Sequence, residues 1–310
     1  MEDVKAQLAL LTRVVTDLQK VVLELKAEIS ALRSQSSLPK AVEPLKAVET
    51  PPATATSGPE IPDEPWTDAE AKTQAPCGST GNQLVKTPKI VAETDLTSRE
   101  KVELFAGLFA GRSDVYATRW ASRTDAQKSG YSPKCTMRYT EGCSLKCHLC
   151  PHRAYEKVTA GTYYSHLKGD IVMGVYPLLT DNTCRFAVLD FDDSDWERDG
   201  KAVIKTARKH GIPLVPEISR SACGVHLWLF LSVPMQAAVV RRVLERLIAL
   251  TIADMGLLKL DSFDRIIPCQ DELPRGNSSI GNLVALPMQL EAKARGGSVF
   301  VDDDLNIIER

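Results

Sequence analysis

Two aspartates, Asp190 and Asp192, stand two residues apart at the end of an apolar run, Phe186-Ala187-Val188-Leu189. The run is typical of a buried β-strand, and because strand side chains alternate between faces, both carboxylates point the same way. Like charges held this close favour a divalent cation, and Mg²⁺ takes one or two carboxylates together with substrate phosphates. The pair therefore predicts a metal site. A strand that merely ends in an acidic turn is the alternative, since Asp193 and Asp195 follow.

A turn between two predicted strands, residues 219–224, offers groups that suit a triphosphate. The guanidinium of Arg220 can fork onto phosphate oxygens, and the hydroxyl of Ser221 and the amide of Gly224 add donors. The imidazole of His226 leads the second strand and so projects from a fixed position. The loop is typical of a nucleotide site, although a lone histidine that begins a strand often has only a structural role.

A third acidic segment, residues 261–271, supplies Asp261, Asp264 and Asp271 next to predicted strands. One of these carboxylates could complete the metal site of the acidic strand. Three carboxylates holding two ions about 3.5–4 Å apart would lower the pKa of an attacking hydroxyl and neutralise a leaving pyrophosphate. A polar surface loop is the alternative on composition.

Four cysteines lie close together in the sequence: Cys135, Cys143, Cys147 and Cys150. Thiolates with this spacing can surround one tetrahedral ion, which predicts a structural Zn²⁺ site in a loop-rich knuckle over about residues 131–155. A closed shell of four ligands leaves no open position for catalysis. His148 or His152 could replace one cysteine, and buried thiols without a metal are the alternative.

The elements that must position these groups begin at a capping-box pattern, Thr97-Ser98-Arg99-Glu100, ahead of a predicted helix over 102–109. From Gly174 onward strand and helix patterns alternate. The predicted strands are 174–178, 184–192, 212–218 and 225–231, with shorter ones around 257–261, 282–287 and 298–302, and the predicted helices are 196–210 and 235–255. Helices packed on a mixed sheet, an α/β (α+β) fold, are the economical architecture.

The first 33 residues carry a heptad repeat with apolar side chains at both core positions. The a positions are Leu8, Val15, Val22 and Ile29, and the d positions are Val4, Leu11, Leu18, Leu25 and Leu32. Three of the four a residues are β-branched and all but one of the d residues are Leu, which favours a parallel dimer, while Val14 and Val21 at g keep a trimer open. An amphipathic helix packed on its own domain is the alternative.

Residues 34–95 are rich in proline and predict a disordered or semi-rigid linker ahead of a domain at 96–310.

Composition limits the class of protein. The formal net charge of −2 excludes a uniformly basic nucleic-acid binder, so any such surface must be local, and residues 99–168 carry 12 Lys or Arg against 6 Asp or Glu. No apolar stretch reaches the roughly 18 residues that span a bilayer. Glu2 and Asp3 do not fit a signal peptide, so we expect a cytoplasmic protein without disulfides or a membrane.

Seven motifs in order over residues 99–304 resemble one family. They are residues 104–116, Gly130-Tyr131-Ser132-Pro133, the cysteine knuckle, residues 174–179, the acidic strand, the Ser-Arg-Ser turn with His226, and residues 261–270. Together they resemble the archaeo-eukaryotic primase domain found in TOTE conflict systems and in CRISPR-associated primase-polymerases. The resemblance implies a catalytic α/β core with an RRM-like sheet, an inserted zinc knuckle and, in this chain, an N-terminal coiled-coil helix.

The resemblance assigns roles by position. Asp190 and Asp192 match the D-x-D metal ligands, and Gly224-Val225-His226 matches the s-x-H nucleotide-binding motif. Asp264 is the best match to the third acidic ligand because it precedes the Ile-Ile-Pro segment, with Asp261 as the weaker candidate.

The same alignment of motifs implies that Arg220 and Ser221 contact the incoming triphosphate and that the zinc knuckle lies against template or primer. The turn departs from the family in one place. Relatives usually read Ser-Arg-Ser-Gly, whereas Ala222-Cys223 follows Ser221 here. The departure spares the metal and phosphate ligands, so we expect activity.

The implied reaction is template-directed attack of a 3′-hydroxyl on the α-phosphate of an NTP or dNTP, with release of pyrophosphate, with or without a primer. The reaction needs two Mg²⁺ or Mn²⁺ ions and a single-stranded DNA or RNA template. The expected protein partners are a second copy of the chain, through the coiled coil, and a separate helicase for any unwinding. The alternatives are a catalytically idle zinc-containing nucleic-acid-binding module and a metal-dependent nuclease. The nucleotide loop favours synthesis, and three carboxylates argue against the idle module.

Overall fold

The computed structural model describes residues 96–308 apart from 126–127, 142, 144–149, 151, 258 and 274–279. The predicted coiled coil over 1–33 and the predicted linker over 34–95 lie outside the described residues, as do Cys147 and His148. None of the helices in the described part of the chain is long and apolar enough to cross a membrane.

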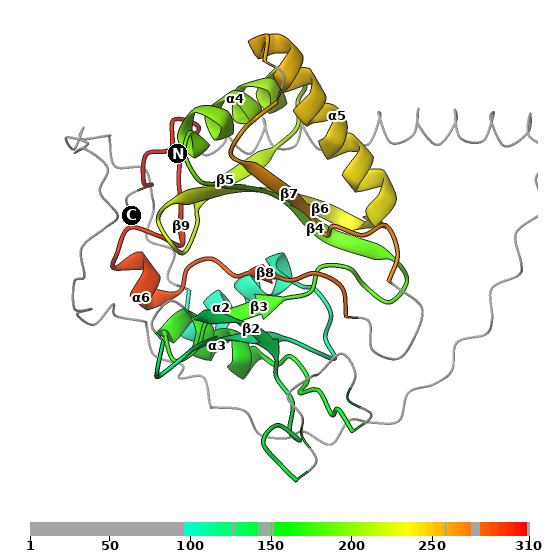
Figure 1. The fold of residues 1–310 in the computed structure, drawn as a ribbon, viewed down its shortest axis with the longest axis vertical. Helices are drawn as coiled ribbons and strands as arrows, with labels where there is room; N and C mark the ends of the chain where they lie inside the picture. The colour runs from blue at the N-terminus through cyan, green and yellow to red at the C-terminus, as the bar shows by residue number, and fades with distance from the viewer. Residues whose placement is uncertain are drawn as a thin grey trace, which may run out of the picture. The chain divides into compact units, whose positions relative to one another are not determined.

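The described residues form two antiparallel sheets, which Figure 1 shows one above the other. The small sheet has the order β2-β1-β3-β8 and comprises β1 (Ala117–Ala121), β2 (Ser129–Pro133), β3 (Met173–Val175) and β8 (Val284–Ala285). The large sheet has the order β7-β4-β6-β5-β9 and comprises β4 (Thr183–Asp192), β5 (Leu214–Ile218), β6 (Gly224–Gln236), β7 (Phe263–Ile267) and β9 (Val299–Phe300). The predicted α/β (α+β) class is confirmed, but every strand pair described is antiparallel, so the sheets are not mixed.

Among the described residues, five helices accompany the sheets: α2 (Ser98–Leu108), α3 (Ala160–Lys168), α4 (Trp196–Lys209), α5 (Ala237–Met255) and α6 (Leu290–Lys293). The capping box expected at the start of α2 is present, since the Thr97 hydroxyl accepts from the Glu100 amide and the Glu100 carboxylate accepts from the Thr97 amide. These bonds satisfy amide groups that would otherwise have no partner in the first turn. The helix therefore begins at Ser98, directly after the predicted N-cap and four residues before the predicted range of 102–109.

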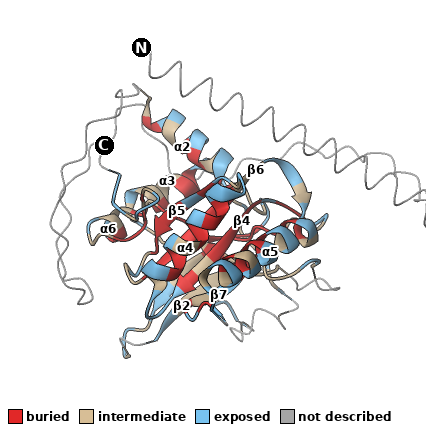
Figure 2. Ribbon diagram, turned by 90° about the horizontal axis from the view of Figure 1, so that it is seen from above, coloured by how far each residue is buried: buried red, intermediate tan, exposed pale blue. Residues whose placement is uncertain are grey.

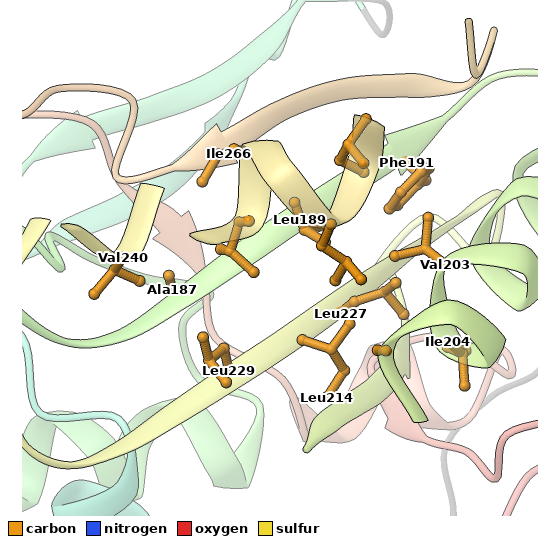
Figure 3. Packing of buried hydrophobic residues seen from close by; sticks show 14 of the residues in the cluster. Ala187, Leu189, Phe191, Val203, Ile204, Leu214, Leu227, Leu229, Val240 and Ile266 are labelled. Carbon is orange, nitrogen blue, oxygen red and sulfur yellow. The ribbon is translucent and has the colours of Figure 1, made fainter. Parts of the chain in front are cut away.

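The central strand β4 is buried on both faces because each face meets a different layer. Its odd-numbered side chains, such as Leu189 and Phe191, pack against α4 and α5, as Figure 3 shows for Val203 and Ile204. On the opposite face, Phe186 and Val188 pack in a second core with residues of the small sheet and of α2 and α3. That core contains Phe186, Val188, Trp228, Met173, Val175, Val284, Phe105, Phe109 and Tyr163. Figure 2 shows the buried stripe that runs along β4 and the inner side of α4.

A buried histidine ties α3 to the small sheet. The amide of Met173 donates to His166 Nδ1 at 3.1 Å, and His166 Nε2 lies 2.9 Å from the carbonyl oxygen of Pro287. Because Nδ1 accepts, Nε2 carries the proton and the ring is neutral. Burial lowers the pKa of His166 to about 4, against the opposing effect of hydrogen bonds to the backbone of Pro287 and Ile171, so the ring is a structural link in this form.

Two strand predictions need correction. The strand predicted over 257–261 is wrong for the residues described there, and β7 at Phe263–Ile267 pairs with β4 instead. The physical reason is that β7 places Ile266 in one core and Ile267 in the other, while Leu260 reaches the core from a loop. Strands β1 and β2 have no counterpart among the predicted elements, because they are short and half exposed and so show little periodicity.

Candidate metal and nucleotide site

The acidic end of β4 lies on the face that the strand turns toward the small sheet. Asp190 and Asp192 continue the row of Phe186 and Val188, as alternation requires. Along the neighbouring strand β6, Asp190 is opposite His226 and Asp192 is opposite Gly224. The antiparallel pairing therefore sets the predicted nucleotide loop directly beside the predicted metal ligands.

Asp264 joins this pair through an irregularity in β7. Asp190 lies opposite Arg265 and the next residue, Phe191, lies opposite Phe263, so Asp264 is the extra residue of a β-bulge. A bulge re-aims the side chain of its extra residue, and such bulges are common beside active sites. The ligand oxygens of Asp190, Asp192 and Asp264 all lie within 4.8 Å of one another.

Asp261, the weaker candidate for the third ligand, does not join the group. Its carboxylate forms an ion pair with Lys259 Nζ at 2.8 Å, and its side chain is more than half exposed. Within the described ranges, the three aspartates form the one group of three or more acidic, histidine or cysteine side chains close enough to share an ion. The geometry therefore favours Asp264 over Asp261.

The three carboxylates could bind a metal ion together. Burial raises the pKa of Asp192, and the negative charges of Asp190 and Asp264 raise it further, against the opposing effect of His226. One oxygen of Asp190, Oδ1, is buried and has no hydrogen-bond partner. His226 Nε2 lies 3.4 Å from this oxygen and makes an ion-pair contact with it. An unsatisfied buried oxygen among three carboxylates fits a hard ion such as Mg²⁺ or Mn²⁺.

A buried carboxylate that the sequence analysis missed holds His226. Glu217 on β5 is 1% exposed and accepts hydrogen bonds from His226 Nδ1 at 2.7 Å and from Trp228 Nε1 at 3.0 Å. Burial alone would lower the pKa of His226, but the charges of Glu217 and Asp190 outweigh it and raise that pKa to about 10. His226 is therefore a cation clamped between two carboxylates. The sequence could have identified Glu217 by its residue type, because a glutamate within an apolar strand must have a partner.

The turn between β5 and β6 is held by short-range hydrogen bonds. The Ser219 amide donates to the Gly224 carbonyl at 2.9 Å, the Ala222 amide donates to the Ser219 carbonyl at 2.9 Å, and the Ser219 and Ser221 hydroxyls lie 2.9 Å apart. Ala222 adopts a φ of 60°, in the left-handed region that glycine prefers. The position where relatives carry glycine is thus one where this backbone is under strain.

Gly224 is needed for space. A Cβ atom there would lie 2.5 Å from both Asp192 Oδ1 and the Phe191 carbonyl oxygen, closer than real Cβ atoms approach. The loop backbone and the predicted metal ligand Asp192 are therefore in direct contact. Of the predicted nucleotide-binding residues, Gly224 and His226 lie opposite Asp192 and Asp190, and Arg220 and Ser221 lie in the turn that leads to them.

The cysteines give no complete metal site. Cys135, Cys143 and Cys150 are partly exposed and not in disulfides, and Cys147 is outside the described residues. The three thiols that are described do not appear together in a group close enough to share an ion. The Ala154 amide donates to Cys135 Sγ at 3.3 Å. The structure thus does not support the predicted zinc knuckle.

Substituting Glu217 by glutamine should lower the pKa of His226 from about 10, because the first of the charges that raise it is removed. The protonated ring stabilises the fold fully below the unfolded pKa of about 6.5, and this contribution is lost as the pH rises through the folded value. The free energy of unfolding of the wild type should therefore decrease as the pH rises from the unfolded to the folded pKa of His226. This decrease should be smaller in Glu217→Gln. Imidazole proton shifts in NMR measure the titration directly, and Glu103→Gln on the exposed face of α2 is the control. An imidazole that titrates near its ordinary pKa in both wild type and variant would contradict this assignment.

The comparisons with known proteins identify a family for residues 100–310. The family model of the TOTE conflict system archaeo-eukaryotic primase domain matches residues 100–310. No curated protein matches the chain. Among solved structures, the chain is similar to the polymerase domain of Mycobacterium tuberculosis ligase D in complex with DNA, at 16% identity and a TM-score of 0.38, over 61% of this chain and 73% of that one. With more than half of its length matched, the chain belongs to the TOTE conflict system family of archaeo-eukaryotic primase domains, which makes it a primase-type nucleotidyltransferase.

Proposed function

We propose that this chain is a primase-polymerase that adds nucleotides to a 3′-hydroxyl under the direction of a single-stranded template. The observation that carries the proposal is the group of three carboxylates within 4.8 Å of one another, beside a Ser-Arg-Ser turn. Residues 96–310 would be the catalytic domain. Its large antiparallel sheet, covered on one face by α4 and α5, would be the RRM-like part of that domain.

Asp190, Asp192 and Asp264 would hold two Mg²⁺ or Mn²⁺ ions, and the buried free oxygen of Asp190 supports this role. When bound, such ions lower the pKa of the attacking hydroxyl and neutralise charge on the leaving pyrophosphate. The carboxylates themselves orient the reacting groups, since all three project to one spot from adjacent strands. Rigid placement of this kind removes much of the entropic barrier to a reaction between two bound substrates.

The turn would hold the incoming nucleotide. Arg220 and Ser221 would donate hydrogen bonds to phosphate oxygens, which charged donors bind strongly. The cationic ring of His226, fixed by Glu217, lies beside Asp190 and would offset negative charge where triphosphate and carboxylates meet. A nuclease has no need for such a loop, so the loop favours synthesis over phosphodiester cleavage.

Polymerisation should require Asp190 and Asp264 but not Asp261. The assay supplies full-length protein with single-stranded template, labelled NTP or dNTP, and Mg²⁺ or Mn²⁺, with and without a primer. Loss of one metal ligand removes several kcal/mol of transition-state stabilisation, so Asp190→Asn and Asp264→Asn should each slow addition by about 100-fold or more. Asp261→Asn, a matched exposed aspartate, should stay within about twofold of wild type.

Three results would count against the proposal in different ways. A wild-type protein that binds template but adds no nucleotide with either metal would indicate an idle binding module. Shortening of the template would indicate a nuclease. Loss of addition in Asp261→Asn with retention in Asp264→Asn would leave the reaction intact and show that the third ligand is assigned wrongly.

We also propose that the cysteine knuckle binds one structural Zn²⁺ and lies against template or primer, on the spacing of its four thiols. Elemental analysis of the purified chain should find about one zinc per molecule. Cys147→Ser should lower this content strongly, whereas Cys269→Ser, a partly buried free thiol elsewhere, should not change it. Equal zinc in both variants would contradict the site.

A third proposal is that residues 1–33 pair as a coiled coil, with 34–95 as linker, which would make the protein a dimer. Light scattering of the full chain tests it. Leu11→Glu with Leu18→Glu, both at d, should yield monomers, because charges would enter the seam. Arg13→Glu with Lys20→Glu, at the outward f positions, should leave the dimer intact. A wild-type monomer would refute the pairing.

A further inference from the structure

A second buried acid lies close to the site without belonging to it. Asp199, in the first turn of α4, is fully buried, and among the acids that the structure describes only Glu217 is buried to a similar degree. Asp199 Oδ2 accepts two hydrogen bonds from the turn before β7, one from the Ser262 hydroxyl at 2.8 Å and one from the Ser262 amide at 3.2 Å. A buried carboxylate is costly unless it is hydrogen-bonded in this way. Asp199 therefore binds Ser262 through both its side chain and its backbone.

The other oxygen of Asp199 has a charged partner at the surface. Arg198 Nε donates to Asp199 Oδ1 at 2.9 Å, and Arg198 Nη2 lies at the same distance from that oxygen. The Arg198 side chain is about half exposed, whereas Ser262 is 3% exposed. The charge of the carboxylate is thus offset on its solvent side, and the bonds to Ser262 lie on its inner side. Hydrogen bonds that are shielded from water are the stronger and more rigid ones.

Ser262 is bonded in turn to the acidic strand. Its carbonyl oxygen accepts from the Asp192 amide at 2.9 Å. A chain of hydrogen bonds therefore runs from Asp199 through Ser262 to Asp192. It ties the start of α4 to the end of β4 that carries two of the predicted metal ligands, and Asp264 follows only two residues after Ser262.

These bonds act on the bulge that turns Asp264 toward the site. On one side of the bulge, Arg265 is paired with β4. On the other side, Phe263 is paired with β4 and its ring centroid lies 5.4 Å from that of Phe191. Ser262 fixes the chain one residue before Phe263. Because the extra residue of a bulge can move along a strand only when the flanking pairs break, these contacts confine the bulge to Asp264.

The start of α4 is itself fixed against β6. A Cβ atom at Gly200 would lie 2.7 Å from Val225 Cγ1, closer than real Cβ atoms approach, so a larger residue would force the helix away from the strand. Val225 stands between Gly224 and His226 on β6. The helix turn that carries Asp199 is therefore held at a constant distance from the strand beside the acidic site.

We propose that Asp199 is a positioning residue of the metal site, which binds Ser262 and thereby sets where the Asp264 carboxylate lies. This inference rests on the proposed function, because it takes Asp264 as a metal ligand. Asp199 is fully buried, so it acts only through Ser262. Residues that orient metal ligands from outside the coordination shell typically change metal affinity by about 10- to 100-fold when they are lost.

Binding of Mn²⁺ alone to the full chain tests the proposal without reliance on turnover. Calorimetry should show an affinity about tenfold lower in Ser262→Ala, which lacks the hydroxyl that Asp199 accepts from. The affinity should be lower still in Asp199→Ala, which leaves the Ser262 amide without its acceptor as well. Asp199→Asn keeps one acceptor oxygen for Ser262, so it should recover part of the lost affinity. If Asp199→Ala does not fold, Ser262→Ala and Asp199→Asn carry the test.

A matched variant separates positioning from a general loss of stability. Thr206→Val also removes a buried hydroxyl, one that donates to the Ala202 carbonyl within α4. It should lower the free energy of unfolding and leave Mn²⁺ affinity within about twofold of wild type.

Hydrogen exchange gives a second measurement that needs no metal. In Ser262→Ala the amide of Asp192 should exchange faster relative to the amides at the centre of β4, because its acceptor is no longer fixed and the opening is local. This ratio should not change in Thr206→Val.

The outcomes distinguish this inference from the function on which it rests. Wild-type Mn²⁺ affinity in Ser262→Ala and Asp199→Ala, with a loss in Asp264→Asn, would overturn the positioning role and leave the polymerase proposal standing. An equal loss of affinity in Thr206→Val would also overturn it, since any destabilising change would then have the same effect. A wild type that binds no Mn²⁺ would refute both the metal site and the role of Asp199.

Discussion

The pairing of β4 with its two neighbours is the constraint on which both fold and site depend. The strand is covered on both faces, so a shift of one residue would move every side chain to the wrong layer. With that register fixed, Asp190 must face the small sheet, His226 must lie across from it on β6, and the β7 bulge must turn Asp264 toward both. The same contacts that stabilise the core therefore place the ligands, which is why a site of three carboxylates can be rigid without any metal.

A second constraint is the alternation of charge from β5 to β4. Glu217, His226 and Asp190 form a line of negative, positive and negative groups in a largely buried region. Buried ions are costly unless each is paired and hydrogen-bonded, and Glu217 meets this condition while Asp190 does not. At the inner end the charge of Glu217 is offset by hydrogen-bond donors, whereas at the outer end one oxygen of Asp190 has no hydrogen-bond partner. A cation and a phosphate would approach at this outer end.

The sequence alone predicts the parts of this site that are local. Alternation places Asp190 and Asp192 on one side, and the turn before His226 stands out by its residue types. The choice of Asp264 came from a family resemblance, because a bulge in β7 leaves no mark in hydropathy. Glu217 was missed because its importance lies in partners that strand pairing brings from β6. Strands β1 and β2 of the small sheet were missed for a similar reason, because they are too short to show a period and are recognised only by their neighbours.

The buried oxygen of Asp190 also bears on how such a protein can change. A strand selected for folding alone would continue the apolar row of Phe186 and Val188 to its end, since an unpaired carboxylate near the core reduces stability. Activity and stability would thus make opposite demands on Asp190. Laboratory selection for heat resistance in the absence of a divalent ion should therefore discard this acid early, whereas selection in its presence should retain it.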